Sequence, residues 1–128
     1  MRLLLDTHAF LWFIEGNPKI SPLARRLIEN IENARLLSYA SLWEIAIKAS
    51  IGKLPLHEPF DTLIPAELHR NRIETLDFTI EHLSNLVEMP FHHRGPFDRL
   101  LVSQAIVEGI PILSADEVFD TYRVQRLW

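Results

Sequence analysis

The chain has 128 residues, 48% of them apolar and 23% charged, which describes one domain with a hydrophobic core rather than a disordered chain. It has no cysteine, which excludes disulfides, thiolate catalysis and sulfur-bound zinc, and suits a reducing cytoplasm. The net charge of −4 disfavours nucleic-acid binding over the whole surface, since such proteins are usually basic. The longest apolar run, Ala9 to Ile14, is too short to cross a bilayer, and the N-terminus lacks a signal-peptide pattern. We therefore expect a single domain over residues 1–128, outside the membrane.

The first part of the chain predicts a strand and two helices. The apolar run Arg2–Leu5 predicts a buried strand, and the spacing of apolar side chains predicts a helix over Thr7–Glu15 that Gly16 ends. Ser21, followed by proline, is placed to cap a second helix. The inward stripe of that helix is expected to comprise Leu23, Leu27, Ile28 and Ile31.

The middle of the chain predicts two further strands around a helix. Arg35–Tyr39 and Ile73–Leu76 are short and apolar, as buried strands are. Ser41-Leu-Trp-Glu44 has the spacing of a capping box, so we expect a helix that opens there and ends at Gly52. Leu54–Pro65 contains three prolines and predicts a loop into a short helix.

The last part of the chain repeats the alternation. Thr79 is expected to cap a helix through Val87, and an apolar helix is expected over Pro96–Glu108. A fourth strand follows at Ile110–Leu113, and a weak last strand is expected near Tyr122–Val124. Because strands and helices alternate throughout, the sequence predicts parallel pairing and a layered α/β fold.

Four acids lie at the ends of these elements. Asp6 closes the first strand and Asp116 follows the fourth, whereas Glu44 and Asp98 are expected in the first turns of helices. In a parallel α/β sheet the carboxyl ends of strands and most helix N-termini share one edge, where ligands bind. Because like charges raise one another's pKa, four carboxylates gathered there need protonation or a divalent cation. An all-oxygen ligand set suits Mg²⁺ or Mn²⁺.

A cation bound by the acids at this edge could act on a phosphodiester. It would also neutralise the negative charge that disfavours nucleic-acid binding. Bound Mg²⁺ can lower the pKa of a water, orient a phosphodiester and neutralise the leaving oxygen. With the acids neutralised, the rest of the surface is near neutral. Four cationic side chains are expected near the mouth of the site: Lys48, Lys53, Arg94 and Arg99.

Four motifs carry these acids in order: LLLDTH around Asp6, SLWEIAIK around Glu44, HRGPFDRLL around Asp98, and SAD ending at Asp116. Together they resemble the PIN-domain family, and most closely its VapC-like branch of type II toxin–antitoxin ribonucleases. The resemblance runs nearly end to end, through the closing Tyr122–Trp128.

The resemblance implies a three-layer α/β/α sandwich around a central parallel sheet, and an endoribonuclease that uses Mg²⁺ or Mn²⁺. Asp6 and Asp98 would be the core metal ligands, with Glu44 and Asp116 completing the site directly or through water. It also implies an RNA substrate, a cognate antitoxin that lays a helix or strand over the site, and a homodimer in the cytoplasm. Gly95 departs from the family, because close relatives often carry an acid before Pro-Phe-Asp. That change affects either a second metal position or only the charge of the loop.

Six other side chains near the acids are candidates for contact with the substrate: Thr7, His8, Lys48, His93, Arg94 and Arg99.

Each acid also has a structural interpretation. Glu44 completes a capping box, and Asp98 is an acid in a first turn, where the helix dipole favours negative charge. Asp116 is suited to a turn or an N-cap. Asp6 is costly to bury at the end of an apolar strand unless it is paired, with Arg99 as one candidate partner.

Two other functions compete with the nuclease. One is a PIN-like scaffold that has lost catalysis and only binds partners, which Gly95 alone favours. The other is a phosphatase with Asp6 as nucleophile. That chemistry usually needs a second acid two residues later, where this chain has His8.

Overall fold

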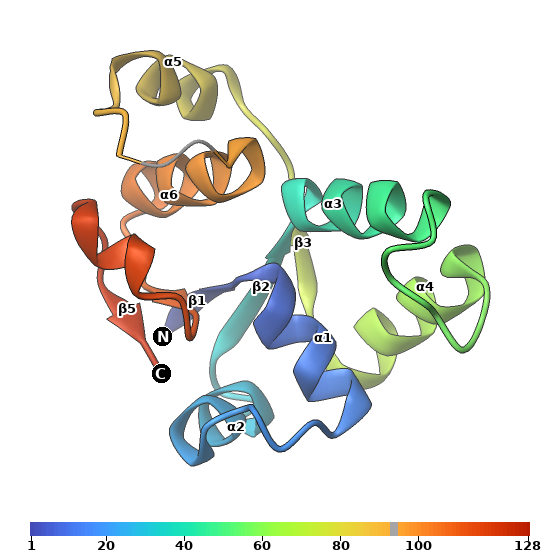
Figure 1. Cartoon of the computed structure of the whole chain (residues 1–128). Helices are drawn as coiled ribbons and strands as arrows, with labels where there is room; N and C mark the ends of the chain where they lie inside the picture. The colour runs from blue at the N-terminus through green and yellow to red at the C-terminus, as the bar shows by residue number, and fades with distance from the viewer. Residues whose placement is uncertain (93–94) are drawn as a thin grey trace.

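The computed structural model describes residues 1–92 and 95–128, and over these residues it contains one five-stranded, all-parallel sheet (Figure 1). Its strand order is β3-β2-β1-β4-β5, so β1 is central and β2 and β4 flank it. The strands are β1 (Arg2–Leu5), β2 (Ala34–Ser38), β3 (Glu74–Leu76), β4 (Ile112–Leu113) and β5 (Arg126–Leu127).

Helices cover both faces of the sheet. Over the described residues they are α1 (Thr7–Glu15), α2 (Pro22–Glu29), α3 (Tyr39–Ser50), α4 (Phe60–Asn71), α5 (Ile80–Glu88), α6 (Pro96–Glu108) and the short 3₁₀ helix η1 (Glu117–Thr121). One core gathers side chains of α1, α2 and α4, and the other gathers side chains of α6 and η1. The predicted three-layer α/β/α sandwich is therefore confirmed.

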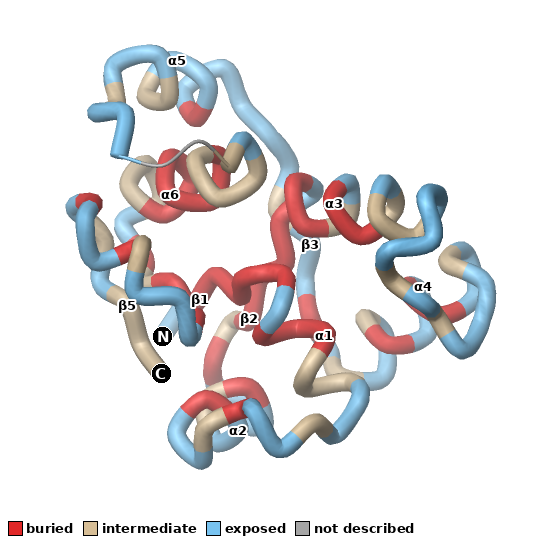
Figure 2. Tube along the Cα trace, in the orientation of Figure 1, coloured by how far each residue is buried: buried red, intermediate tan, exposed pale blue. Residues whose placement is uncertain are grey.

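The central strand explains why the layers form. Leu3, Leu4 and Leu5 are all fully buried, and the buried colour runs through β1 in Figure 2. Leu4 packs in one core, and its two neighbours pack in the other. A parallel strand covered on both faces needs such an uninterrupted apolar run. Each fully buried leucine contributes about 1.5–3 kcal/mol of transfer free energy. Helix α3 contacts both cores, Ala40 in one and Ile45 in the other, so it lies across the carboxyl edge of the sheet.

Several helix ends match the sequence closely. Ser21 caps α2 by accepting a hydrogen bond from Ala24 N at 3.0 Å, and Thr79 caps α5. Gly16 ends α1 with φ +66°, in the left-handed region that glycine adopts without strain.

The N-cap of α3 was predicted three residues too late, at Ser41. The helix begins at Tyr39 and Ser38 is its N-cap, accepting from Ala40 N at 2.9 Å. Ser41 is therefore inside the helix and forms no capping box, and Glu44 lies in the second turn rather than the first. The last residue of β2 serves directly as the cap, so no loop separates strand from helix.

The predicted inward stripe of the second helix was wrong in part. Ala24 and Ile28 are buried and Leu27 packs partly against the core, whereas Leu23 is exposed. Ile31 is 68% exposed because the helix ends at Glu29, before the stripe would reach it.

Two other elements differ from their predictions. The expected loop into a short helix is present, but the helix is longer than expected: α4 begins at Phe60, continues through Pro65 to Asn71, and buries Leu63 and Ile64. The loss of one backbone donor at a proline is offset there by burial of this apolar face. The last strand is Arg126–Leu127 rather than Tyr122–Val124, because these later residues pair with β4.

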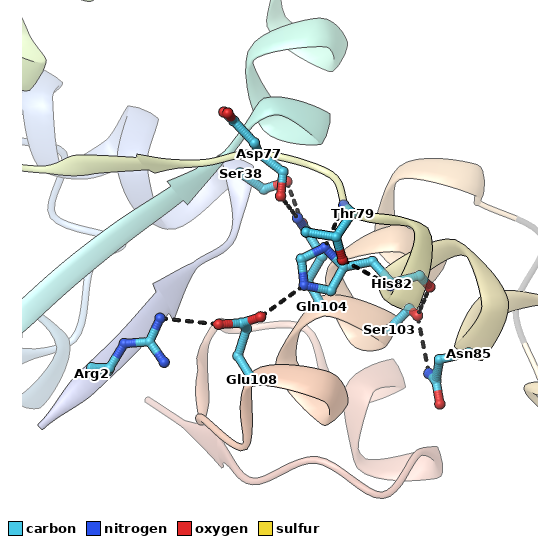
Figure 3. A network of polar contacts seen from close by, with 9 residues as sticks. All are labelled: Arg2, Ser38, Asp77, Thr79, His82, Asn85, Ser103, Gln104 and Glu108. Atoms are coloured by element: carbon cyan, nitrogen blue, oxygen red, sulfur yellow. Dashed lines mark hydrogen bonds and ion pairs between the residues drawn. The ribbon is translucent and has the colours of Figure 1, made fainter.

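A polar network fastens α5 and α6 to the sheet (Figure 3). Thr79 N donates to Nδ1 of the fully buried His82 at 3.1 Å, and His82 Nε2 lies 2.9 Å from a carboxylate oxygen of Glu108. Because the backbone N–H can only donate, Nδ1 accepts and Nε2 carries the proton. Glu108 also pairs with Arg2 of β1 at 3.2 Å. This network holds α6 over β1, and with it Asp98 in the first turn of α6.

None of the helices in the described ranges is long and apolar enough to cross a membrane.

Candidate active site

Asp6 is the most buried of the four acids and caps α1. Its side chain is 6% exposed, and Oδ1 accepts a hydrogen bond from Ala9 N at 2.7 Å. Oδ2 accepts a hydrogen bond from the hydroxyl of Ser114, which follows β4 and is fully buried. Asp6 is thus held in place from two sides, by its own helix and by the neighbouring strand end.

The position of Asp6 makes its charge costly. The pKa of Asp6 is raised from 3.8 to about 6, mainly by burial and to a smaller extent by the nearby charge of Asp98. Hydrogen bonds from Ser114 and Ala9, together with the charge of His8, oppose this rise. The effect of Asp98 places the two carboxylates within electrostatic reach of each other. A divalent cation between them would remove the cost of keeping both ionised.

Glu44 is held by a second set of contacts. It is 8% exposed, Oε1 accepts from Thr7 Oγ1 at 2.7 Å, and Oε2 pairs with Lys48 at 2.7 Å, one helical turn later. Ser41 Oγ lies 3.0 Å from the same Thr7 hydroxyl. Since Thr7 directly follows Asp6, this network connects Glu44 to the end of β1.

Asp98 and Asp116 enter the site from the other face of the sheet. Asp98 is half-buried in the first turn of α6, as predicted. Asp116 is exposed and caps η1, since Oδ1 accepts from Val118 N at 3.0 Å. Its backbone N donates to Ser114 Oγ at 3.0 Å. Ser114 therefore bridges Asp6 and Asp116, and the N-cap interpretation of Asp116 is confirmed.

The arrangement of the acids suits an ion that keeps several waters, such as Mg²⁺, better than an ion enclosed by protein ligands alone. Among the residues described, no three acidic or histidine side chains stand together as a ready metal cluster. Mg²⁺ usually keeps several waters and binds through one or two carboxylates. Asp6 and Asp98 lie within electrostatic reach of each other, whereas Glu44 pairs with Lys48 and Asp116 caps η1.

Among the peripheral candidates, Thr7 and Lys48 directly contact Glu44, and His8 is exposed near Asp6. Arg99 points elsewhere. It donates to Pro90 O at 3.0 Å, and its guanidinium lies 4.8 Å from the centroid of the Phe91 ring. The Asp6–Arg99 pair considered from the sequence is therefore not formed.

His93 and Arg94 lie outside the described residues. Gly95 is the N-cap of α6 and has an ordinary negative φ of −63°.

Sequence reasoning missed the hydroxyl groups that hold the acids. Ser114 and Ser41 are fully buried and bind the site, although neither was a candidate. For Ser114 a signal was present, because a hydroxyl residue placed between a strand end and Asp116 is suited to hydrogen-bond a neighbouring acid.

The fold and this site together define an α/β/α protein with an acidic site at the carboxyl edge of its central parallel strand. The chain belongs to the PIN-domain family, whose model matches residues 3–125.

One relative is similar in sequence over part of the chain. Ribonuclease VapC16 of Mycobacterium tuberculosis is 44% identical over 46 residues, which cover 36% of this chain. The match spans only 33% of that relative's length.

Solved structures match nearly the whole chain at lower identity, and so support the fold. VapBC2 from Rickettsia felis, bound to a promoter DNA fragment, has a TM-score of 0.74 at 20% identity, covering 99% of this chain and 98% of that one. DNA-bound VapBC from Salmonella typhimurium has a TM-score of 0.74 at 18% identity and coverages of 99% and 97%. VapBC-5 from Mycobacterium tuberculosis, a member of a toxin–antitoxin family, has a TM-score of 0.62 at 16% identity and coverages of 98% and 97%.

Proposed function

We propose that this PIN-domain protein is an endoribonuclease dependent on Mg²⁺ or Mn²⁺, and the toxin of a type II toxin–antitoxin pair. The observation that carries the proposal is the buried carboxylate of Asp6, held by Ala9 and Ser114 at the carboxyl end of β1 with the charge of Asp98 nearby. Such a pair is costly without a cation, and a cation beside an open edge can act on a phosphodiester. The name of the VapC16 relative supports RNA as the substrate.

The side chains would divide the work as follows. Asp6 and Asp98 would hold the cation, with Glu44 and Asp116 on its waters. When bound, the ion would supply an activated water and neutralise charge on the leaving oxygen. Ser114 fixes the direction of Asp6 through its hydrogen bond.

The contacts of Glu44 suit a group that handles protons or water. Thr7 donates to its Oε1, and the ammonium of Lys48 pairs with its Oε2. A charged, oriented carboxylate at the edge of the site can accept a hydrogen bond from a water that attacks a phosphate.

The partners follow from the same proposal. The structural neighbours include VapBC complexes, which supports a cognate antitoxin for this chain, and we expect a homodimer in the cytoplasm. Ile80, Leu83 and Val87 are exposed along one face of α5. Exposed apolar side chains in a row are typical of surfaces that bury area against another protein.

The proposal is tested by cleavage of an end-labelled mixed RNA pool with Mg²⁺, Mn²⁺ or EDTA. We expect cleavage only with metal, and its loss in Asp98→Asn but not in Asp61→Asn, a matched exposed acid in the first turn of α4. Cleavage that persists in EDTA or in Asp98→Asn would refute the site. No cleavage, together with no stabilisation by Mn²⁺, would instead favour the non-catalytic scaffold.

The phosphatase alternative has little support in the geometry of Asp6. Both of its oxygens already accept hydrogen bonds, from Ala9 and Ser114, and the residue two positions later is an exposed histidine. A trapped phosphoenzyme would revive this alternative.

A further inference from the structure

A small pocket of about 160 Å³ opens beside the acids, between α1, α3 and the segment that follows α3. Its floor is apolar. Its polar and aromatic lining comprises Thr7, His8, Trp12, Glu15, Lys48 and Lys53. Nothing in the proposed chemistry of the acids uses Trp12, Glu15 or Lys53.

The pocket is continuous with the site. Thr7 and Lys48 line it and are the two residues that bind the oxygens of Glu44. Thr7 also directly follows Asp6. A group in this pocket would therefore lie beside the residues that hold Glu44 and follow Asp6, and single-stranded RNA can run from one such site to the next along its backbone.

One wall of the pocket is formed by the aromatic rings of His8 and Trp12, and Trp12 is held in place by a further ring contact. The rings of His8 and Trp12 are 5.7 Å apart at 45°, and Trp12 meets Trp128 edge-on at 5.9 Å. The contact with Trp128 limits the rotation of the indole, so its orientation is set before any ligand arrives. Aromatic side chains of this kind stack on unpaired bases in RNA-binding proteins.

Two charged side chains beside this wall suit the two parts of a nucleotide, Lys53 its phosphate and Glu15 its base. Lys53 is exposed and forms no ion pair within residues 1–92 and 95–128, which leaves its ammonium for a phosphate. Glu15 is also exposed, and its carboxylate can only accept hydrogen bonds when ionised. Guanine presents two neighbouring donors to one carboxylate, N1–H and the N2 amino group, whereas adenine, cytosine and uracil each present one.

We propose that this pocket binds the base of an unpaired nucleotide next to the phosphodiester that is cut, and so contributes to the choice of RNA sequence. The base stacks on Trp12, Glu15 accepts from its amino group, and Lys53 contacts the adjoining phosphate. This inference rests on the proposed ribonuclease function. It adds a specificity site that is separate from the four acids.

The first test reads the sequence around the cuts. Random-sequence single-stranded RNA is cleaved by the wild-type chain with Mg²⁺ or Mn²⁺, and the ends are sequenced. We expect guanine to be enriched at one position next to the cut, and Glu15→Gln to reduce that enrichment about threefold or more, because an amide offers one acceptor oxygen and a donor in place of two acceptor oxygens. The control is Glu29→Gln, an exposed acid on α2, which should leave the preference unchanged.

The second test measures binding without cleavage, in the Asp98→Asn background with Mg²⁺, using labelled RNA hexamers of each base. We expect Trp12→Leu to weaken binding about tenfold, and Trp12→Phe, which keeps a ring, to restore most of it. Lys53→Gln should weaken binding with less dependence on the base, against Arg25→Gln on α2 as the matched control. Thermal melting identifies any variant that has lost its fold.

The outcomes separate the two proposals. If the wild type cleaves RNA but Glu15→Gln leaves the preference unchanged and Trp12→Leu binds as well as its parent, the base pocket is wrong and the nuclease stands. If the wild type cleaves no RNA with either metal, the proposed function fails, and the hexamer measurements alone decide the pocket. Hexamer affinities that do not depend on Trp12 or Lys53 would overturn it and leave a protein segment as the occupant.

Discussion

Thr7 Oγ1 lies 2.7 Å from Oε1 of Glu44, and this hydrogen bond joins the first residue of α1 to the second turn of α3. Both residues are buried. The bond means that the segment carrying Asp6 and the helix carrying Glu44 are positioned together. The neutral side chain of Thr7, which directly follows Asp6 in the sequence, thus sets the position of Glu44 relative to Asp6.

Replacement of Thr7 by valine should therefore lower the stability of the fold, although valine has nearly the same shape as threonine. Thr7→Val leaves a buried carboxylate oxygen of Glu44 without its donor, which we expect to lower the free energy of unfolding by about 1–3 kcal/mol. Thr7→Ser keeps the hydroxyl and should lose less. Urea denaturation of the three proteins measures this, and equal midpoints for Thr7→Val and the wild type would show that the bond contributes nothing.

Asp6 should make the metal-free protein less stable as the pH rises. Its pKa is about 6 when folded and 3.8 ordinarily, so between these values the folded state holds a proton that the unfolded state has lost. The folded state then gains stability at low pH and loses it as the pH rises through about 4 to 6, by about 3 kcal/mol at most.

Asp6→Asn removes this titration while keeping an acceptor for Ala9 N. In EDTA we expect the variant to be more stable than the wild type at pH 7 and to lose the difference near pH 4. Denaturation across this pH range measures both effects. A wild type whose stability rises through that window relative to Asp6→Asn would contradict the raised pKa.

His82 should be important for stability although it lies away from the acids. It is fully buried, accepts from Thr79 N and donates to Glu108. His82→Leu leaves the Thr79 N–H without its acceptor and Glu108 without its donor, for an expected loss of about 2–4 kcal/mol. His57→Leu, at an exposed histidine, should change the unfolding free energy little. Similar losses in both variants would argue against the network.

Tyr122, in contrast to His82, has a buried polar group whose removal should not lower stability. Within the described part of the chain its buried hydroxyl has no hydrogen-bond partner, while its ring contacts His92 at 5.1 Å. Tyr122→Phe removes an unsatisfied polar group and keeps the ring, so stability should stay equal or rise by up to about 1–2 kcal/mol. A clear loss of stability in thermal melts would mean that the hydroxyl does bind something in solution.

The sequence predicted the elements whose ends carry their own signals. Arg2–Leu5 is one apolar run between polar residues, and Ser21 and Thr79 are strong caps, so these boundaries agree with the structure. The helix expected after the loop in Leu54–Pro65 is longer than predicted, because Pro65 signals a break locally, whereas burial of Leu63 and Ile64 is decided by the rest of the fold.

The four acids as a metal site stay a prediction, and the contacts that hold them were not foreseen. Parallel topology was enough to expect Asp6, Glu44, Asp98 and Asp116 at one edge of the sheet. The hydroxyls of Ser41 and Ser114 could not be assigned, because which oxygen meets which acid depends on how two helices and a strand end pack. For the same reason the pocket beside Trp12 was not foreseen.

Mn²⁺ binding, followed by electron paramagnetic resonance near neutral pH, tests the central claim most directly. The account predicts that the wild type binds Mn²⁺ and that Asp6→Asn and Asp98→Asn each weaken binding about tenfold or more, while Glu29→Gln does not. Equal Mn²⁺ affinities in the wild type and in both Asp variants, or no binding by any of them, would contradict the assignment of Asp6 and Asp98 as the metal ligands.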